Sequence, residues 1–215
     1  MMMCVVSVLS VSVAMSQTDE ERSEMAKQML DKMQAKNKSY ASTTAMFVLT
    51  LENHQDNSKR EYKGMLKTKG NKYVLDVVNT VTFFDGSAVC TWLKDDREAN
   101  ITSADDAGEA AIGPMQILGS YGSGYKMRYL DDVTVDKAVC AEIDLYPTDH
   151  KSRITRVRLT VDKSTYTIKR IMQQCKDGTV YYVAISSFKT NVEIADSEFT
   201  FDVKQHPDVE VVDLR

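Results

Sequence analysis

The chain has 215 residues, of which 43% are hydrophobic and 27% are charged, and its formal net charge is −4. This composition excludes a disordered polar tail and a collagen-like fibre. No run of Lys and Arg is longer than two residues, so the chain lacks the basic face that nucleic-acid binding requires. After the N-terminus, no apolar stretch reaches the roughly 18 residues that a membrane-spanning helix needs.

The N-terminal segment, residues 1–16, is apolar and uncharged, and a charged sequence follows it directly. Its closing residues Ala14 and Ser16 are small, as at the cleavage site of a secretory signal peptide. No Lys or Arg precedes the apolar stretch, so a cytosolic helix behind a misassigned start codon is the alternative. Cys4 lies before the apolar stretch, whereas a lipidated cysteine follows one. We therefore expect a signal peptide over residues 1–16 and one exported domain without a lipid anchor over residues 17–215.

Three cysteines would remain after cleavage, and an odd number cannot pair completely. Cys140 and Cys175 lie on predicted strands two apart, which places them about 10 Å from each other. A disulfide needs Cα atoms within about 7 Å. We therefore expect free thiols at both positions and at Cys90, and no C-x-x-C spacing suggests a metal.

Residues 18–39 carry the clearest helical pattern, which Thr18 can cap. Met25, Met29 and Met33 recur every four residues and form one apolar stripe. Such a stripe is more often plain core than a ligand contact. Methionine is also flexible, however, and is common on surfaces that adapt to varied apolar partners. We expect this helix to lie on a surface and cover part of the fold.

From residue 45 onwards the hydrophobic period changes to two, which is typical of β-strands. Asp85-Gly86 and Asp177-Gly178 each stand between two such segments and predict tight hairpins. Strand patterns recur as far as residue 188, so the sequence predicts about ten antiparallel strands. Two of them present one apolar face each, formed by Phe47, Leu49 and Leu51 and by Tyr73, Leu75 and Val77.

Residues 94–124 interrupt the strand pattern. Ser103 and Pro114 can each begin a short helix, and the second helix would carry Ile117, Leu118 and Tyr121. A long twisted sheet tends to curl. The predicted fold class is therefore mainly β with an α lid (α+β): a curled antiparallel sheet that forms an incomplete barrel closed by short helices.

No motif in the sequence indicates catalysis. The three histidines, His54, His150 and His206, have no second His and no Cys three or four residues away as a metal-ligand partner. Nucleophile-elbow, phosphate-loop, dinucleotide-binding and zinc-protease signatures do not occur. We therefore expect a binding protein without a cofactor or a metal, with no catalytic residue. The alternative is an enzyme whose site is assembled from distant residues, which a panel of ester and phosphoester substrates would reveal.

Several short motifs occur in a particular order along the chain. Lys69-Gly70-Asn71 leads into the strand of Tyr73, and the Asp85-Gly86 hairpin follows. Near the C-terminus come an Asn-containing bend that ends at Asn191, a Phe-x-Phe pair and a Pro-x-Val-x-Val tail that ends near Asp213. In this order and spacing, the motifs resemble the periplasmic outer-membrane lipoprotein carrier family, LolA, and most of all its Bacteroidetes-type members.

The resemblance implies a soluble, monomeric periplasmic carrier with a hydrophobic cavity under a helical lid. Such a carrier takes acylated lipoproteins from an inner-membrane lipoprotein-releasing transporter and passes them to an outer-membrane acceptor. A binding or sensing module of the same architecture for another hydrophobic ligand is the alternative. On the carrier interpretation, the cavity is lined by Met25, Met29, Met33, Phe47, Leu49, Leu51, Tyr73, Leu75, Val77, Cys90, Trp92, Ile117, Leu118 and Tyr121.

One position departs from the family pattern. Lys69-Gly70 stands where the family has an Arg-Pro pair whose arginine bonds the lid. Lys69 is therefore the candidate for a lid latch, although lysine lacks the planar fork of arginine.

Overall fold

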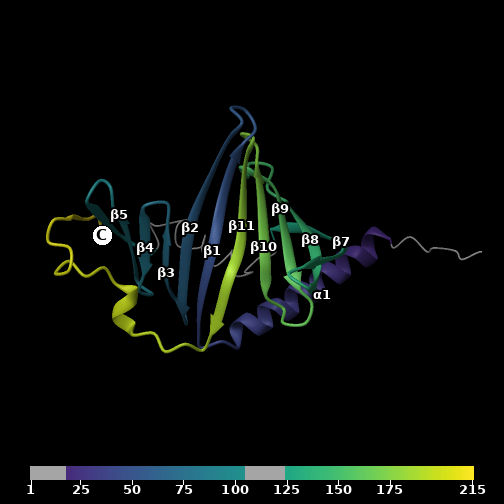
Figure 1. Ribbon diagram of the computed structural model, residues 1–215, viewed down its shortest axis with the longest axis horizontal. Helices are drawn as coiled ribbons and strands as arrows, with labels where there is room; N and C mark the ends of the chain where they lie inside the picture. Colours follow the sequence, from purple (N-terminus) through teal and green to yellow (C-terminus); the bar gives the residue numbers. More distant parts are fainter. Residues whose placement is uncertain (1–17, 105–123) are drawn as a thin grey trace, which may run out of the picture.

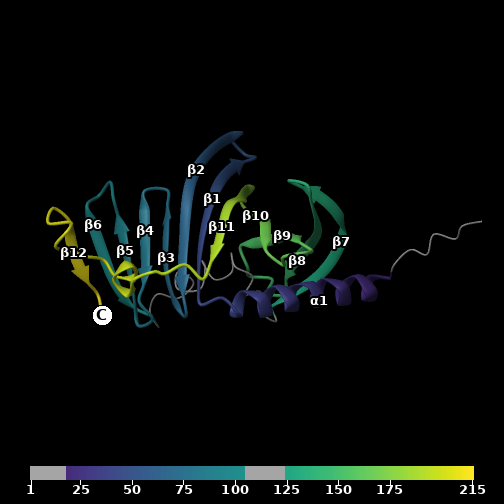
Figure 2. The same ribbon diagram turned by 60° about the horizontal axis from the view of Figure 1, so that its bottom comes forward.

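The computed structural model describes residues 18–104 and 124–215, and it forms one curled sheet with a helix across one face (Figures 1 and 2). The sheet order is β12-β6-β5-β4-β3-β2-β1-β11-β10-β9-β8-β7. Neighbouring strands are antiparallel, apart from the parallel pair β12 and β6. Over the residues that the structure describes, β12 and β7 do not pair, so the sheet stays open. The predicted fold class is confirmed.

The elements follow one another in a simple order along the chain. They are α1 (Asp19–Lys38), β1 (Ser42–Asn53), β2 (Ser58–Lys69), β3 (Lys72–Val77), β4 (Thr80–Phe84), β5 (Ala88–Leu93), β6 (Glu98–Ser103), β7 (Tyr125–Val135), β8 (Ala138–Pro147), β9 (Ile154–Asp162), β10 (Ile168–Cys175), β11 (Thr179–Thr190), the 3-10 helix η1 (Asp196–Phe199) and β12 (Glu210–Asp213).

The start of α1 is fixed by a capping box, as the sequence suggested. The Thr18 hydroxyl accepts a hydrogen bond from the backbone N–H of Glu21 at 3.2 Å, and the Glu21 carboxylate accepts one from the N–H of Thr18 at 2.8 Å. Both bonds satisfy donors that a helix start leaves unpaired. The helix buries Ala26, Leu30 and Met33 against the sheet.

The Asp-Gly hairpins form where they were predicted. The Asp85 carboxylate accepts hydrogen bonds from the backbone N–H groups of Ser87 and Ala88 at 2.8 and 2.9 Å. Gly86 has φ +102°, which an L side chain rarely adopts. Gly178 lies in the same left-handed region, at φ +81°, between β10 and β11.

The structure has more strands than the sequence predicted. β6 lies within residues 94–124, which were expected to break the pattern, and it pairs with β5 along its whole length. β12 adds a short parallel strand beside β6. The two short helices expected after Ser103 lie outside the described residues.

The sheet separates two hydrophobic clusters. The larger cluster lies on the concave face and contains the buried side chains of α1. The smaller one lies on the convex face, where residues 192–206 cross β2 to β5 (Figure 1); we call this segment the C-terminal strap. Cys90, Cys140 and Cys175 are free, as expected, and Cys90 and Cys140 are buried. In the described ranges, no helix combines the length and apolar character that crossing a membrane requires.

Candidate functional site

The concave face is a continuous apolar wall that runs beneath α1. Strands β1 to β3 and β7 to β11 all contribute buried side chains to it. Alternation along each strand directs every second residue to this face. The wall and helix include, among others, Met33, Phe47, Leu66, Tyr73, Ile143, Leu159 and Val183.

A glycine lets the wall pack closely at its centre. Phe47 on β1 stands directly opposite Gly64 on β2. A Cβ atom at position 64 would lie 2.3 Å from the Cζ atom of Phe47, so the phenyl ring occupies the space that any side chain would need. The absence of a side chain at Gly64 therefore positions Phe47 against the sheet.

Two polar contacts tie the N-terminal half of α1 to the sheet edge: the hydrogen bonds of Arg22 and an ion pair of Asp19 with Arg128 of β7 at 3.3 Å. Arg22 donates to the backbone carbonyl of Tyr129 at 3.1 Å and also to that of Leu130. The pairing of β7 with β8 shifts register at this point, and β7 is an edge strand, so its carbonyls are accessible to the helix. Nearby, the Asp132 carboxylate accepts from the Tyr129 hydroxyl and, at 2.6 Å, from the Lys163 ammonium group. The contacts of Arg22 hold α1 to this edge of the apolar wall.

Most of the predicted lining residues do share the concave face. Met33, Phe47 and Tyr73 are in its buried cluster, and Met25, Met29, Leu49, Leu75 and Val77 pack against it. Leu51 follows on the same face of β1 and is half-buried. Ile117, Leu118 and Tyr121 lie outside the described residues. Whether these residues contact a ligand stays a prediction.

Cys90 and Trp92 do not share that face, so this part of the predicted lining is wrong. Tyr73 pairs with Phe84, and Phe84 pairs with Val89. Each pairing joins an odd-numbered to an even-numbered residue, so the odd-numbered residues of β5 point to the concave face. Trp92 instead packs with Phe199 in the convex cluster, and Cys90 stands opposite Phe83 of the same face.

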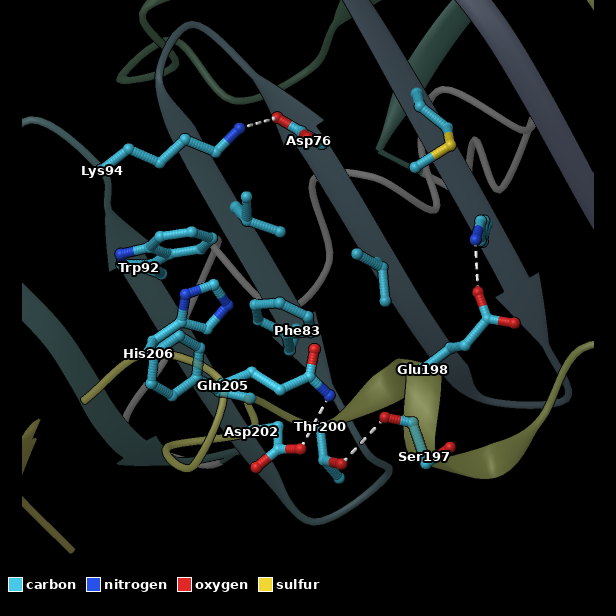
Figure 3. A pocket seen from close by; sticks show the side chains of 15 residues that line it. Asp76, Phe83, Trp92, Lys94, Ser197, Glu198, Thr200, Asp202, Gln205 and His206 are labelled. Carbon is cyan, nitrogen blue, oxygen red and sulfur yellow. Dashed lines mark hydrogen bonds and ion pairs between the residues drawn. The ribbon is translucent and has the colours of Figure 1, made fainter. Parts of the chain in front are cut away.

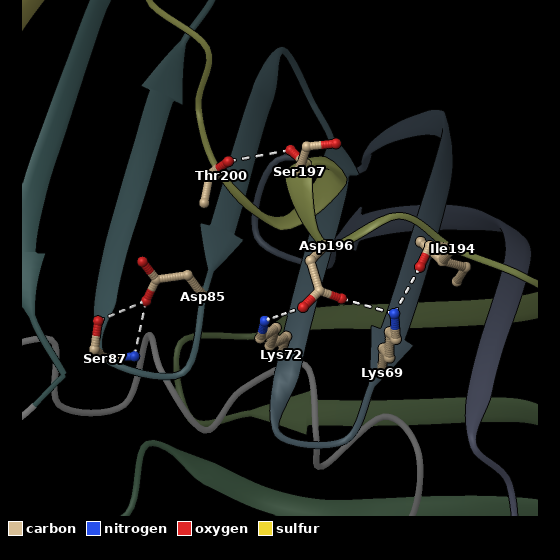
Figure 4. Close-up of polar contacts among 8 residues, drawn as sticks. All are labelled: Lys69, Lys72, Asp85, Ser87, Ile194, Asp196, Ser197 and Thr200. Atoms are coloured by element: carbon tan, nitrogen blue, oxygen red, sulfur yellow. Dashed lines mark hydrogen bonds and ion pairs between the residues drawn. The ribbon is translucent and has the colours of Figure 1, made fainter.

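Lys69 has a different partner from the one predicted for a lid latch. Its ammonium group donates to the carbonyl of Ile194 at 2.8 Å and to the Asp196 carboxylate at 2.7 Å, and Lys72 binds the same carboxylate at 2.9 Å (Figure 4). Hydrogen bonds from these two lysines lower the pKa of Asp196 to about 2. Because Thr68 faces the concave cluster side, Lys69 points to the convex face and fastens the C-terminal strap, not α1.

The strap encloses a groove that sequence reasoning missed (Figure 3). The groove has a volume of about 680 Å³. His206 lies 4.3 Å from Trp92 and 5.2 Å from Phe201 between ring centroids, and it stacks on Phe201. The indole Nε1 of Trp92 is buried and has no hydrogen-bond partner among the described residues. In the sequence, only the Phe-x-Phe pair of the tail pointed to an apolar contact here. Its position beside Trp92 depends on the path of the strap, which the sequence does not give.

Burial shifts the pKa of a titratable side chain on each face of the sheet. Burial raises the pKa of Tyr73 to about 12, so its hydroxyl stays protonated at neutral pH. On the other face, burial raises the pKa of Cys90 to about 11, which keeps the thiol unreactive. Within residues 18–104 and 124–215, no three His, Cys, Asp or Glu side chains gather in a way that could hold a metal ion.

Comparisons with known proteins agree with this architecture. A family model described as outer membrane lipoprotein carrier protein LolA matches residues 16–191. A search of curated proteins finds no match. An uncharacterized conserved protein from Thermus thermophilus superposes with a TM-score of 0.59 at 11% identity, covering 88% of this chain and 99% of the other. At this identity the likeness shows the fold alone.

Two further solved structures are similar at lower scores. A LolA superfamily protein from Nitrosomonas europaea has a TM-score of 0.45 at 15% identity, covering 82% of this chain and 97% of its own. The lipoprotein LppX of Mycobacterium tuberculosis has a TM-score of 0.48 at 12% identity, covering 80% of this chain and 98% of its own. Since the family match spans most of the sequence, this chain belongs to the family of the outer membrane lipoprotein carrier protein LolA.

Proposed function

We propose that this protein is a lipoprotein carrier that holds acyl chains against its concave face and moves them from the inner to the outer membrane. The observation that carries the proposal is the continuous apolar wall, to which eight neighbouring strands of one open sheet contribute and which α1 covers towards the β7 end (Figure 2). An open sheet with this interior can accept a long flexible chain along its length, which a closed packed core could not.

The energetics of acyl chains explain why a carrier is needed. Each buried methylene is worth about 0.8 kcal/mol, so exposing a chain of roughly 14 methylenes costs on the order of 11 kcal/mol. A triacylated lipoprotein therefore does not cross water unaided. Since α1 now covers the wall, loading requires the helix to move. Met25 and Met29, which are only partly buried, can adapt to a lipid that takes its place.

The proposal includes the place and the partners of the carrier. Residues 1–16 serve as a signal peptide, and residues 17–215 act as one monomeric domain in the periplasm. An inner-membrane lipoprotein-releasing transporter supplies the cargo, and an outer-membrane acceptor receives it. The protein acts by binding and release, without catalysis and without a cofactor.

Two neighbouring residues of β1 provide a matched test. Leu49 packs against the concave cluster, whereas Val48 points to the convex face. Delipidated protein should bind a triacylated lipopeptide, as measured by displacement of a hydrophobic fluorescent dye. Leu49→Gln should weaken binding several-fold, and Val48→Gln should leave it unchanged.

Mass spectrometry of protein purified under native conditions should find acylated protein or lipid bound to it. Protein that is repeatedly recovered without ligand, and that binds neither dye nor lipopeptide, would contradict the proposal. Equal effects of the two β1 variants would place the acyl chains somewhere other than the concave face.

A further inference from the structure

Along one row of side chains, the concave face changes from apolar to polar between β3 and β4, although Phe84 of β4 and Val89 of β5 add apolar side chains to the same face. Cross-strand pairing defines one row of side chains that runs Leu66, Leu75, Thr82, Thr91, Asn100. Its first two members belong to the apolar wall. The next three are a hydroxyl, a second hydroxyl and an amide on three adjacent strands, β4, β5 and β6, which lie side by side at one end of the sheet (Figure 2).

These polar groups are half-buried. Thr82 and Thr91 are opposite each other, and Thr102 lies on the same face of β6, opposite Val89. None of the three hydroxyls forms a hydrogen bond to any residue that the structure describes. A threonine hydroxyl can donate one hydrogen bond and accept others. Among the described residues, three such hydroxyls therefore stand beside the apolar wall without a hydrogen-bond partner.

The charge of this region restricts what it could bind. On the concave faces of the described strands β4, β5 and β6, the only charged side chain is Glu98, whose carboxylate accepts a hydrogen bond from the Asn100 amide at 2.6 Å. The lysines of the neighbouring strands, such as Lys69 and Lys94, point to the convex face. On these three strands an anionic phosphate would thus meet a carboxylate and no cation, whereas a neutral carbonyl would meet hydroxyl donors.

We infer that Thr82, Thr91 and Thr102 form a subsite for the neutral polar end of an acylated peptide, meaning its glycerol ester and amide carbonyls. The acyl chains extend from there over the apolar wall of β1 to β3. This inference rests on the proposed function and adds a direction to it, because it places the protein part of the cargo at the β4 to β6 end.

The test replaces hydroxyls with methyl groups of nearly the same shape. Thr82→Val with Thr91→Val should bind a tripalmitoylated cysteinyl peptide about tenfold more weakly, since two hydrogen bonds are lost. Binding of a neutral hydrophobic dye should be unchanged. Thr82→Ser with Thr91→Ser keeps the hydroxyls and should retain most of the affinity. Thr44→Val is the matched control, because Thr44 faces the convex side and its hydroxyl also has no partner among the described residues.

The outcomes separate this inference from the proposed function. Wild-type affinity for the lipopeptide in the double valine variant would overturn the subsite and leave the carrier role intact. Tighter binding of phosphatidylglycerol than of the lipopeptide, with the same loss in the valine variant, would overturn the choice of a neutral ligand. Failure of the wild-type protein to bind dye and lipopeptide alike would instead remove the proposed function. If circular dichroism shows that the double variant is unfolded, Thr102→Val alone provides the same comparison.

Discussion

The two faces of the sheet are covered in different ways. On the concave face, α1 rests on an apolar wall through methionine, leucine and alanine side chains, and Arg22 bonds to backbone carbonyls at the sheet edge. On the convex face, the C-terminal strap is held by the Asp196 clamp with two lysines and by Phe199, which is fully buried. The strap also packs aromatic rings against Trp92.

The difference indicates which covering can be exchanged. Apolar contacts lack direction, so a lipid can replace the contacts of α1 with similar ones. Hydrogen-bonded ion pairs and a buried aromatic anchor depend on particular partners, and a lipid cannot replace them. We therefore regard α1 as the movable covering and the strap as a permanent part of the fold. Substitutions on each face of the sheet can test this distinction.

Removing the aromatic anchor of the strap should cause the largest loss of stability. Phe199 has no exposed surface and packs with Val74 and Val81. Phe199→Ala should lower the free energy of unfolding by about 3–5 kcal/mol, measured by urea denaturation. The fraction that stays folded should bind lipopeptide normally. A loss of binding in folded protein would show that the convex covering also serves the cargo site.

Adding a methyl group beneath Phe47 should disturb the apolar wall. In Gly64→Ala the new Cβ would overlap the Phe47 ring, which has to move. We expect a loss of about 1–3 kcal/mol in stability together with weaker lipopeptide binding. Gly124→Ala is the control, because none of the described atoms lies within 4 Å of a Cβ placed there. Equal stability of the two variants would mean that the wall is loosely packed.

Removing the contact of Arg22 with the sheet edge should increase the local opening of α1 more than it lowers the global stability of the protein. Arg22→Gln loses charge-assisted hydrogen bonds to the carbonyls of Tyr129 and Leu130. Because these bonds are partly exposed to solvent, we expect the free energy of unfolding to fall by about 1 kcal/mol or less. Amide hydrogen exchange should accelerate in α1 while β8 and β9 stay protected. Lipopeptide should also bind faster. Unchanged exchange in α1 would argue that the apolar contacts alone hold the helix.

The ion pairs of Asp196 with Lys69 and Lys72 should make the stability of the fold depend slightly on pH. The folded pKa of Asp196 is lowered to about 2 from 3.8, so its contribution is present above pH 4 and is lost as the pH falls towards 2. Asp196 is exposed, and solvent screening keeps the effect small. The urea midpoint of Asp196→Asn should fall less steeply over this range than that of the wild type. If the urea midpoints of the two proteins changed with pH in parallel, the ion pairs of Asp196 would not stabilise the strap.

Trp92, the only tryptophan of the chain, gives a test in which no change is expected. It lies under the strap, on the face opposite the apolar wall. Lipopeptide with brominated acyl chains should therefore leave its fluorescence nearly unquenched. Strong quenching would place acyl chains in the convex groove.

The Asp-Gly hairpins show what local sequence could predict. Asp85 and Gly86 supply a carboxylate that accepts from the turn's N–H groups and a residue tolerant of positive φ, so the turn follows from its own residues. The helix start at Thr18 and Glu21 is local in the same sense. The two-residue period of Phe47 and Leu49 likewise identified a strand and one of its faces. These features depend on residues only a few positions apart.

The opposite cases depend on the register between strands and on the path of the tail. Trp92 alternates as cleanly as Tyr73, but only the pairing through β4 decides which of them faces the apolar wall. Lys69 matched a family position, yet its partner Asp196 lies 127 residues away in sequence. The sequence by itself therefore determined most of the elements, the family and the part of the apolar wall that α1, β1 and β3 supply. Only the tertiary structure decided which side chains share a face and what each covering holds, because those relations arise from long-range pairing that no local pattern encodes.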